Sequence, residues 1–424
     1  MTDQQKILSK MRDMTRDMMR GAPQAATAAI QEALQQVRAG QQPGGAGHAG
    51  QPTGAGPILR DINPPPLGKA ASMPESATFA PGGLHTNGMP SGAAKIMGDV
   101  KSFVPELLAK LGVAADGSGL GRMPGKTPAA PLPEGAKFDS GSFANAAGSR
   151  HYKLYVPAAY HGQALPLVVM LHGCTQDPDD FAAGTQMNAV AEAQKCLVLY
   201  PQQSQAANSS KCWNWFNAGD QARDNGEPSI IAGMTREVAA RYNVDPKQIF
   251  VAGLSAGGAM AAIMGTIYPD LYAGVAVHSG LPYGAATDLP SALAAMHSGM
   301  AKTPAQAQQA GGGQAFKGIP VIVFHGDADH TVNMRNGEQV MAGAVPSGSA
   351  AGVRSREQGQ VPDGHAYTRT VQKDAAGRPV AEHWLIHGFG HAWAGGSANG
   401  SYTDARGPDA SGEMMRFFYT QAAH

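Results

Sequence analysis

The chain has 424 residues, its formal net charge is zero, and 43% of its residues are hydrophobic. A neutral chain does not attract the phosphates of nucleic acids, and the sequence contains no apolar run of the roughly 18 residues that a membrane span needs. The length is sufficient for one large α/β domain with additional sequence. The three cysteines lack the spacing of metal ligands, so we expect neither a metal nor another cofactor.

Residues 1–38 predict a short helical hairpin. Apolar side chains, among them Met11, Met14 and Met18, recur at three- and four-residue steps, and a Gly-Ala-Pro sequence separates the two helices. The methionine face is either an adaptable docking surface or the contact between the two helices. The first of these helices is charged throughout and lacks the apolar core of a secretion signal, so we expect a cytoplasmic protein.

Residues 39–137 are dominated by glycine, proline and alanine. Such a composition buries too little apolar surface to offset the entropy of the chain. We therefore predict a linker that is largely disordered, with one short helix at 95–111. The linker contains no candidate catalytic group.

The remaining residues, 138–424, form the predicted catalytic domain. Strand-like and helical patterns alternate there, which indicates an α/β fold with a mostly parallel sheet and helices on both faces. Such sheets carry their functional sites at the carboxyl ends of the strands. The expected strands are 142–147, 151–156, 165–171, 196–200, 249–254, 274–278, 319–324 and 382–386, and the expected helices are 179–194, 229–242, 256–268 and 409–421.

Ser255 is the candidate nucleophile. It lies in the sequence IFVAGLSAGG, where a buried strand leads directly into a helix, and this context identifies the G-x-S-x-G pattern as a nucleophile elbow. A serine on such a sharp turn needs small neighbours, which Gly253 and Gly257 supply. The following helix directs its first N–H groups at developing negative charge.

A serine hydroxyl needs a base that an acid holds in one tautomer. After the strand 319–324, Asp329 is the favoured acid, and Asp327 is an alternative that we expect to cap the turn. After the strand 382–386, His391 is the favoured base, and His387 is expected to be structural. The order serine, acid, histidine is that of the α/β-hydrolases.

The oxyanion of an acyl intermediate requires two backbone N–H donors. Ala256 follows the nucleophile directly and is the first candidate. The second is expected in the loop after the strand 165–171, where Cys174 is favoured over Thr175. We expect the preceding His172 to support this loop.

Trp213 and Trp215 lie in the loop after the strand 196–200. Their rings predict either an aromatic wall for the acyl group or a loop that its aromatic residues anchor. Cys212 precedes them, and its loop and that of Cys174 leave the sheet at the same edge, within reach of a disulfide. A reducing cytoplasm opposes such a bond, so both redox states stay open.

Several segments of the domain resemble one known family. The motifs LHGCTQD, KCWNWF, GLSAGGAMAA, HGDADHTV and GFGHAW occur in this order, and together they are similar to the poly(3-hydroxybutyrate) depolymerase family of esterases. The resemblance implies an α/β-hydrolase that cleaves carboxylic esters through an acyl-enzyme without a metal. It implies a triad of Ser255, Asp329 and His391, and an oxyanion hole at Cys174 and Ala256.

The resemblance favours hydroxyalkanoate esters, polymeric or oligomeric, as the substrate. The family is also similar to feruloyl and acetylxylan esterases, which is the alternative. A further alternative is a protein of polyester granules with secondary hydrolase activity, anchored by the methionine face of residues 1–38.

Overall fold

The computed structural model describes residues 132–299, 319–344 and 352–422. The predicted hairpin at 1–38, the helix at 95–111 and most of the linker at 39–137 lie outside these residues. The first strand begins at Lys137, one residue before the expected start of the catalytic domain. Within the described residues, no helix is long and apolar enough to cross a membrane.

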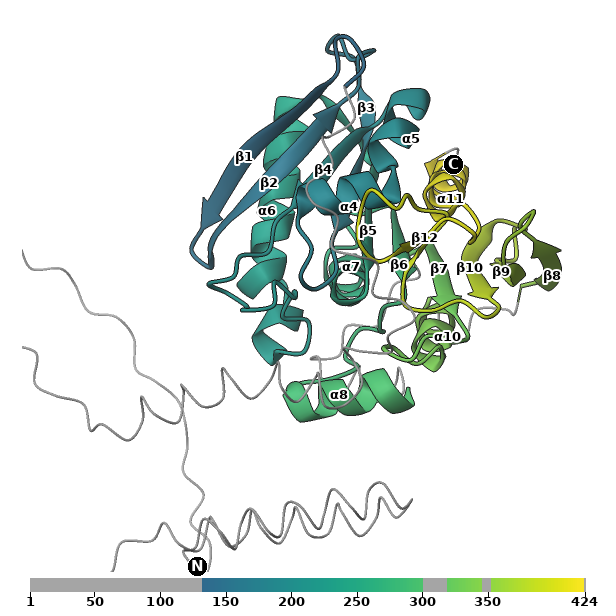
Figure 1. Ribbon diagram of the computed structural model, residues 1–424. Helices are drawn as coiled ribbons and strands as arrows, with labels where there is room; N and C mark the ends of the chain where they lie inside the picture. Colours follow the sequence, from purple (N-terminus) through teal and green to yellow (C-terminus); the bar gives the residue numbers. More distant parts are fainter. Residues whose placement is uncertain (1–131, 300–318, 345–351, 423–424) are drawn as a thin grey trace, which may run out of the picture. The chain divides into compact units, whose positions relative to one another are not determined.

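A ten-stranded sheet forms the centre of the domain. Its order is β1-β2-β4-β3-β5-β6-β7-β10-β9-β8, so the two hairpins β1–β2 and β9–β8 lie at opposite edges (Figure 1). The strands between β4 and β10 are parallel, which confirms the predicted fold class. The strands of the sheet are β1 Lys137–Asn145, β2 Gly148–Val156, β3 Leu165–Leu171, β4 Leu197–Pro201, β5 Val244–Leu254, β6 Gly274–His278, β7 Val321–Gly326, β8 Arg354–Gln360, β9 Ala366–Lys373 and β10 Pro379–Ile386.

Helices cover both faces of this sheet because its central strands are apolar on both sides. In β3, for example, alternate residues enter two different hydrophobic clusters. One cluster packs against α6 Gly226–Arg241, α7 Ala256–Ile267, α8 Leu289–Ser298 and α10 Arg335–Gly343. The other packs against α4 Pro178–Thr185, α5 Met187–Gln194 and α11 Ala410–Ala422. Shorter elements are η1 Ala218–Gln221, β11 Trp393–Ala394 and β12 Thr403–Asp404.

Several parts of the domain differ from the sequence-based expectation, and helices α8 and α10 are among the elements that were not expected. The single helix expected at 179–194 is two helices, because Gln186 adopts a left-handed conformation with a φ of 54° between α4 and α5. The hydroxyl of Thr185 accepts the N–H of Met187 and so satisfies the interrupted backbone. The hairpin β8–β9 was not expected, because the exposed residues of β8 carry no apolar alternation.

The parallel register places the predicted site residues at one edge of the sheet. Leu254 is paired with His278 across β5 and β6, and Gly326 is paired with Ile386 across β7 and β10. Ser255 follows the first of these pairs directly. The loops that carry the candidate acid and base follow the second, so all three groups leave the sheet at its carboxyl edge.

Candidate active site

Ser255 occupies a strained turn between β5 and α7. Its φ is 57° and its ψ is −119°, a conformation that side-chain-bearing residues seldom adopt. Its N–H donates to the carbonyl of His278 at 2.9 Å, and this hydrogen bond attaches the turn to the neighbouring strand β6. The backbone therefore has the strand-to-helix geometry that a nucleophile elbow requires.

The two flanking glycines are required by close backbone contacts. A Cβ on Gly253 would lie 2.3 Å from the carbonyl carbon of Gly257, and one on Gly257 would lie 2.0 Å from the carbonyl oxygen of Leu171. Both distances are far shorter than any real carbon contact. The absence of side chains at these positions thus lets α7 begin directly against the end of β3.

Asp329 and His391 form a hydrogen-bonded pair. Nδ1 of His391 lies 2.8 Å from Oδ2 of Asp329, although 62 residues separate them in the sequence. The other carboxylate oxygen of Asp329 accepts the N–H groups of Thr331 and Val332, at 2.9 and 2.8 Å. The backbone of its own turn therefore holds Asp329 in place. Asp329 in its place orients the imidazole of His391, so that Nε2 is the nitrogen available for a substrate proton.

The surroundings of Asp329 keep it ionised. Burial by itself raises the pKa of this carboxyl, but the nearby His391 and the hydrogen bonds from His325 and His391 outweigh it, so the pKa lies well below its usual range. Its side chain is fully buried, and Nε2 of His325 lies 3.5 Å from Oδ2. A carboxylate that stays charged at neutral pH can stabilise an imidazolium.

The alternative acid and base form a second pair. Nδ1 of His387 lies 2.8 Å from Oδ2 of Asp327, and the other carboxylate oxygen of Asp327 accepts the N–H of Gly388. Nε2 of His387 is 2.9 Å from the hydroxyl of Thr368, so both of its ring nitrogens have protein partners. The structure thus joins Asp327 to His387 and Asp329 to His391, and of these two histidines only His391 has a ring nitrogen, Nε2, with no partner among the described residues.

The loop after β3 lies against the nucleophile. A Cβ on Gly173 would lie 3.7 Å from the Cβ of Ser255. In this loop the N–H of Gly173 donates to Oε1 of Gln176, and that of Thr175 donates to the carbonyl of Ser210. Within the part of the chain that the structure describes, the N–H of Cys174 donates to no protein acceptor. Hydrogen bonding therefore favours Cys174 over Thr175 as the oxyanion donor.

Ala256 supplies the other candidate donor. It is the first residue of α7, where N–H groups have no partner within the helix. The helix dipole adds a partial positive charge at the same point. The two predicted N–H donors thus come from the first residue of α7 and from the loop after β3, and both of these lie next to Ser255.

Cys174 and Cys212 are joined in a disulfide, and Cys196 is a buried free thiol. The bridge ties the loop after β3, the candidate oxyanion loop, to the stretch with Trp213 and Trp215, the tryptophan loop. Trp213 has no exposed surface and belongs to the core, so its burial favours the anchored loop over the aromatic wall. Trp215 is 6% exposed and packs in the same cluster. The alternative, a loop that its aromatic residues anchor, describes both rings better.

Two residues that lie beside the candidate site, His278 and Tyr402, were not identified from the sequence. His278 is buried, and its Nε2 accepts the N–H of Ala394, which connects the His391 loop to the strand beside the nucleophile. Burial lowers the pKa of His278 well below its usual value, so it is a neutral structural group. Its position at the carboxyl end of a predicted strand was the available clue.

Tyr402 is the second missed residue. It is 48% exposed, the φ of its backbone is 53°, and its hydroxyl lies 3.3 Å from that of Thr175 in the oxyanion loop. Its carbonyl accepts the N–H of Trp393, two residues after the candidate base, at 2.7 Å. Tyr402 is therefore an exposed aromatic ring that contacts both the loop of Cys174 and the loop of His391.

The described residues contain no group of three or more His, Cys, Asp or Glu side chains suited to a metal ion. The chemistry of the site is that of a hydroxyl, an imidazole, a carboxylate and two N–H donors. This set can activate a serine and stabilise a tetrahedral oxyanion.

Two known depolymerases are similar to this chain in sequence. The chain is 36% identical over 245 residues to a poly(3-hydroxyalkanoate) depolymerase C of Paucimonas lemoignei, and 29% identical over 281 residues to a poly(3-hydroxybutyrate) depolymerase of Ralstonia pickettii. The matches cover 56% and 63% of this chain, and 57% and 56% of the relatives. The chain thus spans little more than half the length of either.

A solved acetyl xylan esterase from Aspergillus awamori shares the fold, with a TM-score of 0.51 and 20% identity over 64% of this chain and 94% of that one. The family model described as Esterase PHB depolymerase matches residues 150–353, which include Ser255 and Asp329. The matched residues make up just under half of the chain, and this match and the two depolymerase relatives support a domain similar to the PHB depolymerase family of esterases.

Proposed function

We propose that this protein is a serine carboxylic ester hydrolase that acts on hydroxyalkanoate esters through an acyl-enzyme. The observation that carries the proposal is the hydrogen bond between Asp329 and His391 at the sheet edge from which the strained Ser255 projects. The family of the domain and the names of its relatives support ester hydrolysis.

The proposed mechanism has two stages. Oγ of Ser255 attacks the ester carbonyl and gives its proton to Nε2 of His391, while Asp329 stabilises the resulting imidazolium. The oxyanion accepts the N–H groups of Cys174 and Ala256. His391 then returns the proton to the departing alkoxide, and the alcohol leaves. In the second stage a water molecule attacks the acyl-enzyme by the same proton transfers, which releases the acid and restores Ser255.

The proposed substrates are poly- or oligo-3-hydroxybutyrate-like esters, after the two relatives that are named depolymerases. A hydrolysis panel tests this choice: 3-hydroxybutyrate oligomers, amorphous polymer, feruloyl esters, acetylated xylan and p-nitrophenyl esters. We expect the highest kcat/KM on the oligomers. A preference for feruloyl esters or acetylated xylan would assign the domain to the alternative esterase type.

Replacing Ser255 by alanine tests the mechanism. The change Ser255→Ala removes the nucleophile, so we expect turnover to fall on the order of 10⁶-fold with the fold retained. Hydrolysis of p-nitrophenyl butyrate by the purified variant measures this, with circular dichroism as the control for folding. An unchanged rate would remove Ser255 from the mechanism.

The two aspartates form a matched pair of variants. Asp329→Asn places an amide against Nδ1 of His391 and favours the wrong tautomer, so we expect kcat to fall on the order of 10⁴-fold. Asp327→Asn disrupts only the pair with His387 and is expected to affect mainly stability. Steady-state kinetics of both variants decide between them, and the reverse pattern would make Asp327 the catalytic acid.

We further propose that Tyr402 contacts the acyl chain or the leaving group, in place of the buried Trp213. Tyr402→Ala removes an aromatic contact of about 1 kcal/mol, so KM for long esters is expected to rise roughly fivefold. Tyr402→Phe keeps the ring and is expected to retain the KM of the wild type. A series of p-nitrophenyl esters of increasing length measures this, and an unchanged KM for every ester in Tyr402→Ala would exclude the contact.

The methionine face of residues 1–38 is proposed as a docking surface for polyester granules. A variant without residues 1–131 lacks this face but keeps every candidate catalytic group, so short soluble esters should be cleaved at the wild-type rate. We expect less of it to co-sediment with polyester granules. Equal sedimentation of the full chain and the truncated chain would contradict the anchor.

A further inference from the structure

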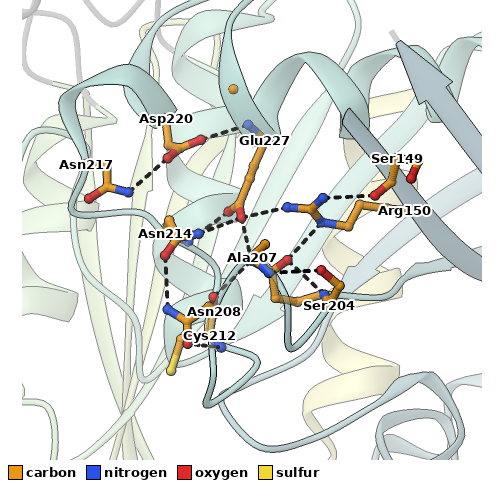
Figure 2. Close-up of polar contacts among 12 residues, drawn as sticks. Ser149, Arg150, Ser204, Ala207, Asn208, Cys212, Asn214, Asn217, Asp220 and Glu227 are labelled. Carbon is orange, nitrogen blue, oxygen red and sulfur yellow. Dashed lines mark hydrogen bonds and ion pairs between the residues drawn. The ribbon is translucent and has the colours of Figure 1, made fainter. Parts of the chain in front are cut away.

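A buried carboxylate outside the triad is held by an unusual number of donors. Glu227, in the first turn of α6, is 4% exposed. Its carboxylate accepts the guanidinium of Arg150 at 3.1 Å, the N–H of Asn214 at 2.8 Å, the side-chain amide of Asn214 at 2.8 Å and the side-chain amide of Gln203. Figure 2 shows Arg150 and Asn214 converging on it from opposite sides.

Gln203 connects Glu227 to the loop that contains Cys212. It has no exposed surface, and its side-chain amide donates to the carbonyl of Cys212 as well as to Glu227. Its side-chain oxygen accepts from Arg150 and from the N–H of Ser204. Every donor and acceptor of this amide is thus occupied, so its position and the adjacent backbone are fixed.

The backbone of Gln203 in turn fixes His172. The N–H of Gln203 donates to Nε2 of His172 at 3.1 Å, so the proton of this imidazole lies on Nδ1. Nδ1 then donates to the carbonyl of Gly173 at 2.7 Å. Burial lowers the pKa of His172 to about 4, so the ring is neutral and keeps this tautomer at neutral pH. In a trans peptide the N–H of Cys174 points away from that carbonyl. The chain of bonds therefore sets the direction of the oxyanion donor.

A second connection reaches the same donor covalently. Glu227 holds the N–H of Asn214, and Gln203 holds the carbonyl of Cys212. Cys212 is bonded to Cys174 through the disulfide. Both the hydrogen-bonded and the covalent restraint on Cys174 thus lead back to Glu227.

We propose that Glu227 is a positioning residue for the oxyanion hole, acting through Gln203 and His172 on one side and through the Cys174–Cys212 bridge on the other. A buried charge is costly unless it is paired and hydrogen-bonded. Here the carboxylate joins Arg150 of β2 to Gln203 and Asn214, which lie at two points of the loop after β4. This inference rests on the proposed ester hydrolysis.

The change Glu227→Gln keeps the size of the side chain but sets a new amide donor against donors that already converge there. The N–H of Cys174 then loses its fixed direction. Full loss of one oxyanion donor costs about 10²- to 10³-fold in kcat, so we expect kcat to fall on the order of 10- to 100-fold. KM should change little, because the ground-state carbonyl depends less on this donor than the oxyanion does.

Two further variants accompany it. Asn214→Ala removes one side-chain donor from Glu227 and is expected to give a smaller fall in kcat. If Glu227→Gln does not fold, the kcat of Asn214→Ala tests the positioning role instead. Glu382→Gln is the matched control, because Glu382 is 1% exposed and pairs with Arg369 and Arg416. We expect this control to lower the melting temperature while kcat stays within about twofold of the wild type.

Kinetics on p-nitrophenyl butyrate and inhibition by phenylboronic acid provide the readout. A boronate forms a tetrahedral adduct with Ser255, so its inhibition constant should rise in proportion to the fall in kcat while KM does not move. A folded Glu227→Gln variant with wild-type kcat and boronate affinity would overturn the inference, and so would an equal loss of kcat in Glu382→Gln. Inactivity of the wild type on all esters would instead overturn the proposed function.

Discussion

The steric contact beneath Ser255 is the constraint on which the catalytic edge of the sheet depends. A left-handed φ of 57° at this residue costs about 1–3 kcal/mol and persists only because its surroundings hold it. Gly257 allows the backbone of α7 to touch the carbonyl of Leu171 at the end of β3. The same contact brings Gly173 and its loop beside the nucleophile. One close approach of two backbones therefore brings the candidate nucleophile and the two candidate oxyanion donors together.

Much of the site could be predicted because its residues follow strands in a fixed order. In a parallel sheet, Ser255, Asp329 and His391 reach one edge wherever they stand in the sequence, so strand ends alone suggest that they meet. The choice of Asp329 over Asp327 was harder, since both carboxylates lie in one turn. The structure separates them by partner: both ring nitrogens of the histidine paired with Asp327 are bonded, whereas the histidine paired with Asp329 has one nitrogen with no partner in the part of the chain that the structure describes.

Other parts of the site could not be predicted, because they depend on contacts between distant segments. Nothing local distinguishes a tryptophan that packs inward from one that lines a pocket, and Trp213 proves to be in the core. Tyr402 follows no expected strand of the sheet, and it lies beside Thr175 although the two are 227 positions apart in the sequence. Glu227 reads as an ordinary acidic residue at a helix start. Only the fold shows that it faces Gln203.

The edge strand β8 affects whether separate molecules associate through their sheet edges. Its residues are almost all exposed, and Arg354, Arg356 and Glu357 give it closely spaced charges. An unpaired strand edge is a template for another chain, and charged side chains oppose that pairing because each would have to be desolvated. The lack of apolar alternation that hid β8 from sequence analysis is thus a safeguard against aggregation. Replacing its charges by valines to strengthen the strand would favour sheet-to-sheet association over solubility.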